Sequence, residues 1–183
     1  MKRTIVAILT ITSAIFISSC SSEKGGLPEE MKTKMSAFEA DWGKAGEAMT
    51  AFGQTMTTTA GELTTMISTN MSMDMSKLSA DMMPKADSLK NVCTSITGSI
   101  TEMQTAYATA MTNWATDQAG YAELKAKAEK GEVKGPELTT GLQGYMDKLT
   151  AATTELGNWT TMLNDLKTKC TSTCDAMTTM MPK

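Results

Sequence analysis

Apolar and small residues recur along most of the chain at alternating steps of four and three positions, and we call each such row a seam. This spacing places the residues along one side of a helix and is typical of helices that pack in bundles or coiled coils. The positions of the three seams are Met31, Met35, Phe38, Trp42, Ala45, Met49, Phe52 and Met56; then Leu89, Cys93, Ile96, Ile100, Met103, Tyr107, Ala110, Trp114, Tyr121 and Leu124; then Leu138, Leu142, Tyr145, Leu149, Ala152, Leu156, Trp159, Leu163, Leu166 and Cys170. They predict helices over roughly residues 28–70, 84–130 and 136–178.

Prolines mark where these helices begin. Pro28, Pro84 and Pro136 each stand just ahead of a seam. Proline is favoured in the first turn of a helix because its missing N–H would lack a partner there in any case. Short connections make consecutive helices antiparallel. The sequence therefore predicts an all-α fold, an antiparallel bundle of three long helices that occupies residues 28–183 as one domain.

The first predicted helix has the weakest helical propensity of the three. It contains Gly43, Gly46, Gly53 and Gly61, and each glycine costs up to about 1 kcal/mol relative to alanine in a helix interior. A break near residues 58–61, followed by a short helix to about residue 80, gives a four-helix bundle as the alternative architecture.

The register of the second and third helices follows from their connection. If the chain folds back around residue 133, facing residues have numbers that add up to about 266. Trp159 then faces Tyr107, and Trp114 faces Ala152. Rings meet at the first pair and a large residue meets a small one at the second, as a dense core requires.

Composition excludes several function classes. Acidic residues number 20 against 17 basic ones, and aromatic residues make up 5% of the chain. This balance argues against nucleic acid as a partner. The chain contains no histidine, so it lacks a histidine general acid or base, a Ser–His or Cys–His pair, and an imidazole metal site. We assign no catalytic residue and do not expect an enzyme.

The N-terminus has the features of an export signal. Lys2 and Arg3 precede an apolar run from Ile5 to Ile17, which is about 13 residues long and too short to span ~30 Å of hydrocarbon. The run ends in Ile17-Ser18-Ser19-Cys20. This segment resembles the lipobox of bacterial lipoproteins, in which an aliphatic residue and two small residues precede an invariant cysteine. The resemblance implies export, removal of residues 1–19 and acylation of Cys20.

The same resemblance implies a location. Residues 20–27 become the acylated cysteine and a polar, glycine-containing tether. Ser21 stands where an aspartate favours retention at the inner membrane in many such families, so the resemblance favours an outer membrane. Several acyl chains anchor a protein permanently. The alternative is an ordinary secretory signal peptide that is cut near the same place.

The cysteines of the bundle converge in the predicted register. In this register Cys93 faces about position 173, which lies between Cys170 and Cys174. Exported proteins meet an oxidising compartment, so we expect a disulfide from Cys93 to Cys170 or Cys174, with one cysteine left over. The Cys-x-x-x-Cys spacing of the last two is not the Cys-x-x-Cys of thiol oxidoreductases.

Methionine supplies 18 of the 183 residues. Met-x-Met-x-Met at residues 71–75 resembles, over five residues, the methionine motifs of copper transporters and copper-resistance proteins. Thioether and thiolate ligands without imidazole select Cu(I), and the bundle topology brings the first turn to the end that holds the cysteines. The candidate ligands are Met71, Met73, Met75, Met82, Met83, Cys93, Cys170 and Cys174. The simpler alternative is that these methionines continue an apolar seam.

The sequence therefore favours a lipid-anchored helical-bundle lipoprotein of the cell envelope. We expect it to act as a non-catalytic interaction or structural module, to bind a protein partner or a second copy of itself, and to need no cofactor. The alternative is a soft-metal protein that handles Cu(I) through the methionine- and cysteine-rich end of the bundle.

Overall fold

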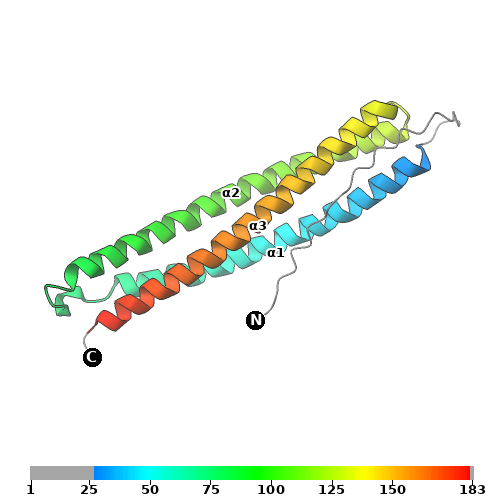
Figure 1. The fold of residues 1–183 in the computed structure, drawn as a ribbon. Helices are drawn as coiled ribbons and strands as arrows, with labels where there is room; N and C mark the ends of the chain where they lie inside the picture. The colour runs from blue at the N-terminus through cyan, green and yellow to red at the C-terminus, as the bar shows by residue number, and fades with distance from the viewer. Residues whose placement is uncertain (1–26, 182–183) are drawn as a thin grey trace.

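The fold is a rod of three long antiparallel helices (Figure 1). The structure, a computed structural model, describes residues 27–181. Its elements are α1 (Glu29–Met71), the one-turn 3-10 helix η1 (Met75–Lys77), α2 (Met83–Glu129) and α3 (Gly135–Met180). No strand occurs within these residues. The predicted three-helix bundle is confirmed, and each helix boundary lies within two residues of its expected position.

Two ends of the rod are distinguished below. The proximal end holds the start of α1 and the turn between α2 and α3, and the distal end holds the connection from α1 to α2 and the end of α3 (Figure 1). The expected signal peptide, the acylation site Cys20 and the tether up to residue 26 lie outside the described residues.

The helix starts follow the proline pattern. Pro28 immediately precedes α1, and Pro84 and Pro136 lie in the first turns of α2 and α3. The proximal turn uses glycine for a different reason, because Gly131 and Gly135 have φ angles of 73° and 53°. A side chain at either position would be strained in this left-handed region.

Helix α1 is continuous through residues 58–61, so the four-helix alternative is wrong. Thr59, Ala60 and Leu63 are buried at this point. The hydroxyl of Thr65 donates a hydrogen bond to the carbonyl of Gly61, four residues earlier. Burial of this stretch against the other helices outweighs the low helical propensity of its residues.

The core changes character along the rod. Its proximal half is aromatic, with Trp42 stacked on Trp114 at 4.1 Å between ring centroids. In its middle, Trp159 meets the edge of Tyr107 at 5.9 Å and stacks on Phe52 at the same separation. The contact between Trp159 and Tyr107 confirms the predicted register of α2 and α3.

Polar pairs join the helices in the proximal half. Lys125 and the hydroxyl of Tyr121, both on α2, donate hydrogen bonds to the carboxylate of Glu39 on α1, at 2.7 and 3.0 Å. The bond from Lys125 lowers the pKa of Glu39, and burial raises the pKa of Tyr121. Asp117, the polar residue where the second seam is interrupted, pairs with Lys148 of α3.

Gly53 permits the close approach of α1 and α2. The Tyr107 hydroxyl reaches across to donate a hydrogen bond of 3.0 Å to the Met49 carbonyl. A Cβ atom at Gly53 would lie 2.3 Å from that hydroxyl oxygen, a separation at which one of the two groups must move.

We expect Gly53→Ala to destabilise the protein by about 1 kcal/mol or more, because overpacking and the displaced hydroxyl outweigh the gain in helix propensity. The matched control is Gly43→Ala, at an exposed position of the same helix with nothing within 4 Å of the added carbon. It should stabilise by about 0.5–1 kcal/mol. Urea unfolding measures both, and equal effects would show that Tyr107 does not occupy this position.

The pair between Glu39 and Lys125 predicts a pH dependence. Because folding lowers the pKa of Glu39 below its ordinary value of 4.5, the carboxylate stabilises the fold above that pH and loses this effect as the pH falls through the folded-state pKa. Glu39→Gln should cost about 1 kcal/mol or less at neutral pH, since both side chains are partly exposed. The difference from the wild type should shrink as the pH falls through the folded-state pKa of Glu39. Glu155→Gln, at an exposed position, is the control, and a deficit that persists in acid would contradict the assignment.

Candidate functional site

Three cysteines meet in the core of the distal end. Cys93 comes from α2 and Cys170 and Cys174 from α3, with exposed fractions of 0%, 0% and 3%. The two thiols of α3 lie one helical turn apart, with their sulfur atoms at 4.0 Å. The convergence that the register predicted is therefore confirmed.

Methionine thioethers extend this group to all three helices. The Sδ atom of Met66 on α1 lies 3.8 Å from the Sγ atom of Cys170. The Sδ atom of Met177 on α3 lies 4.0 Å from the Sγ atom of Cys93. We call Met66, Cys93, Cys170, Cys174 and Met177 the sulfur cluster.

The expected disulfide from Cys93 to Cys170 or Cys174 is not formed, and all three cysteines are free thiols. Cys170 and Cys174 are not joined to each other either, because their sulfur atoms stand 4.0 Å apart and a disulfide joins its sulfur atoms at about 2.05 Å. Register brought the correct helical turns together, but Cys93 packs on the thioether of Met177.

Burial controls the chemistry of the thiols. It raises the pKa of Cys93 and Cys170 above the ordinary value and raises that of Cys174 to about 11. The neighbouring thiol of Cys174 raises the pKa of Cys93 further. The thiolate is the nucleophilic form of cysteine, so these protonated and covered groups are poor nucleophiles at neutral pH.

Hydrogen bonds hold Met66 in place at the end of α1. The side-chain amide of Asn70, which is buried, donates to the Met66 carbonyl at 2.9 Å. The thiol of Cys174 also contacts this carbonyl, at 3.9 Å, and the hydroxyl of Thr178 donates to the Asn70 side-chain oxygen at 3.4 Å. The ends of α1 and α3 are thereby joined beside the sulfur cluster.

The five predicted methionine ligands differ in their exposure to solvent and in their contact with the core. Helix α1 ends at Met71, and the following residues form a loop and η1, so no helical seam continues through them. Met73 and Met75 are half-buried and pack against the core that contains the thiols. Met71 and Met83 are exposed, at 39% and 37%, and Met82 is half-buried. The described contacts join none of the five directly to a thiol.

Sequence reasoning did not select the two thioethers that touch the cysteines. Met66 lies beyond Met56, where the first seam was traced no further. Continuing the same alternating steps along α1 reaches Thr59, Leu63, Met66 and Asn70, of which Thr59, Leu63 and Asn70 are buried. The uninterrupted seam was therefore the available signal for Met66, and it was missed because the seam was traced only to Met56.

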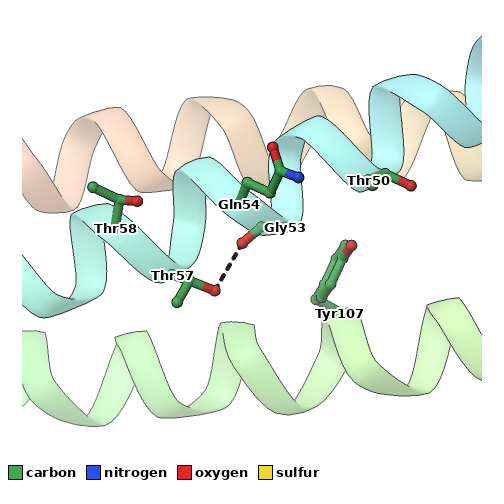
Figure 2. A pocket seen from close by; sticks show the side chains of 6 residues that line it. All are labelled: Thr50, Gly53, Gln54, Thr57, Thr58 and Tyr107. Atoms are coloured by element: carbon green, nitrogen blue, oxygen red, sulfur yellow. Dashed lines mark hydrogen bonds between the residues drawn. The ribbon is translucent and has the colours of Figure 1, made fainter.

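A shallow groove of about 500 Å³ runs between α1 and α2 in the middle of the rod. Its lining residues are Thr50, Gly53, Gln54, Thr57, Thr58 and Tyr107. Figure 2 shows Tyr107 extending from α2 toward α1, and the Thr57 hydroxyl bonded to the Gly53 carbonyl at 2.8 Å. The lining contains no charged residue and no thiol, and its polar groups are hydroxyls and one side-chain amide.

The described residues contain neither a group of metal-ligating cysteine or carboxylate side chains nor a membrane-spanning helix. Within residues 27–181, no three cysteine, aspartate or glutamate side chains form a group that could hold a metal ion. No helix described here has the length and apolar character needed to cross a membrane. Comparisons with family models, curated proteins and solved structures found no match. Fold and site therefore define a class only, a three-helix bundle with thiols and thioethers buried at one end.

The geometry predicts strongly protected thiols. The test uses the full chain carrying Cys20→Ser and a thiol reagent such as Ellman's reagent. The reagent should modify the three cysteines at least about 100-fold more slowly in the native protein than in denaturant. This ratio is expected for sites that open with a free energy of ~3 kcal/mol. Adding Met162→Cys supplies an exposed control, because Met162 is 47% exposed. Rapid labelling of Cys93, Cys170 or Cys174 in the folded protein would contradict their burial.

Proposed function

We propose that the protein is a lipid-anchored lipoprotein of the cell envelope, held at an outer membrane, whose bundle is a non-catalytic interaction or structural module. The observation that carries the proposal is that the acylation motif precedes one end of a long, rod-shaped bundle. Three helices of 43, 47 and 46 residues run together along a single rod. A rod of this kind suits a spacer or a scaffold.

The position of the acylation motif gives the rod a direction. Cys20 precedes the first residue of α1, Glu29, by nine positions, and such a segment reaches at most about 30 Å. Glu29 begins α1 at the proximal end (Figure 1). An acylated Cys20 would keep that end near the lipid, with the distal end about 65 Å away at 1.5 Å per helical residue.

The sides of the rod favour contact with another macromolecule over enclosure of a small substrate. The groove between α1 and α2 is shallow and open, whereas small-molecule sites are concave and bury most of their ligand. Many threonine hydroxyls are already bonded to backbone carbonyls of their own helix, such as Thr50 to Gly46 and Thr161 to Gly157. A protein partner or a second copy of the chain fits such a surface.

Localisation tests the anchor. Cys20→Ala should move the protein from the membrane fraction to the soluble fraction while the helical circular dichroism is retained, because acylation has lost its acceptor. Ser21→Asp should shift the acylated protein from outer to inner membrane, and Ser21→Ala is the matched control that should not. Mass spectrometry of the N-terminus reports cleavage and acylation directly.

Two outcomes would count against this function. An unacylated N-terminus on the wild-type chain would refute the anchor. Native electrophoresis of the gently solubilised membrane fraction tests the interaction role. A complex larger than the 19.6 kDa chain supports it, and a monomer alone contradicts it.

A further inference from the structure

We propose that the sulfur cluster binds one Cu(I) ion, with Cys170, Cys174 and Met66 as its ligands. This inference goes beyond the anchored module and does not depend on it. It also differs from the site expected from the sequence, because the Met-x-Met-x-Met segment at residues 71–75 is not what holds the ion.

The spacing of the sulfur atoms suits a three-coordinate ion. The sulfur atom of Cys170 is in contact with those of both other ligands, at 3.8 Å from the Met66 thioether and 4.0 Å from the Cys174 thiol. An ion with metal–sulfur bonds of about 2.3 Å in a trigonal arrangement holds its ligands about 4.0 Å apart. Because the two cysteines are four residues apart on one helix, α3 fixes both on the same face.

The ligand types determine which metal is accepted. Thiols and thioethers are soft donors and select Cu(I) over harder divalent ions. Cysteine and carboxylate side chains alone form no three-membered metal group in the described residues, so the thioether of Met66 completes the site. Zn²⁺ usually takes four ligands from thiolates, imidazoles and carboxylates, and no three such side chains are grouped in the described residues.

The binding step balances in protons and charge. Because the thiolate is the form of cysteine that binds metals, the thiols of Cys170 and Cys174 each give a proton to the solvent and form a copper–sulfur bond. Met66 binds as a neutral thioether, and copper remains Cu(I) throughout. The bound unit carries one negative charge, and its two cysteine ligands are buried.

The surface methionines provide a route inward. Met71 and Met83 are exposed at the distal end, and Met73 and Met75 are half-buried against the core of the sulfur cluster. Thioethers therefore occur at successive depths between solvent and the thiols. Their role is to pass the ion inward and not to retain it.

The test is an anaerobic titration of the reduced full chain carrying Cys20→Ser, with Cu(I) competed against a colorimetric Cu(I) chelator. We expect the protein to remove one equivalent from the chelator and to develop the ultraviolet absorption of a copper–thiolate bond. Cys170→Ala should abolish this transfer. Met66→Leu should lower the affinity by about tenfold or more, since even supporting groups around metals contribute that much.

Matched variants separate the ligands from their surroundings. Met103→Leu changes another methionine that is buried in the same core and should bind as the wild type does. The triple variant Met71→Leu, Met73→Leu, Met75→Leu should retain the affinity but load more slowly. Circular dichroism checks that each variant folds, and leucine for methionine is among the best tolerated core changes.

Three results would overturn the proposal. The chelator could keep all of the copper, Met66→Leu could bind as tightly as Met103→Leu, or the triple surface variant could abolish binding. A measurement on the unsubstituted bundle keeps the test independent of variant folding. Cu(I) should raise the unfolding midpoint, because a ligand that binds only the folded state stabilises it, and an unchanged midpoint at saturating copper would also refute the site.

Discussion

Mutual burial of three apolar seams along the whole rod is the interaction on which the rest of the structure depends. Helices rich in threonine and glycine have little intrinsic stability, and packing of an apolar face supplies most of the stability of a helix in a protein. Helix α1 shows this directly, because it passes through its least helical stretch where Thr59, Ala60 and Leu63 are covered. Without packing against the other two helices, this segment would have little stability as a helix.

The antiparallel order gives the two ends of the rod different chemistry. Aromatic rings and the pairs Glu39–Lys125 and Asp117–Lys148 occupy the proximal half. The distal end collects the turn after α1, the start of α2 and the end of α3, and with them the thiols. The acylation motif precedes the proximal end, so the proposed anchor and the proposed metal site are kept at opposite ends of the molecule.

Close packing of the distal core gives the thiols their character. Cys93 and Cys170 are completely covered, and thioethers rather than charged groups lie against them. Burial therefore suppresses nucleophilic reactivity while leaving soft donors within contact distance of one another.

Much of this protein was determined by its sequence alone. Proline positions and seam periodicity predicted the helix boundaries to within two residues. The register that pairs Trp159 with Tyr107 also predicted that the cysteines lie close together. Both predictions succeeded because helical periodicity and the position of a chain reversal are local properties of the sequence. Tertiary structure decided between the continuous α1 and the alternative break near residues 58–61. It alone determined that Cys93 packs on Met177 without forming a disulfide, and that Met66 reaches Cys170. Those outcomes depend on how side chains from three helices interleave within a few ångströms, and a one-dimensional pattern does not carry that information.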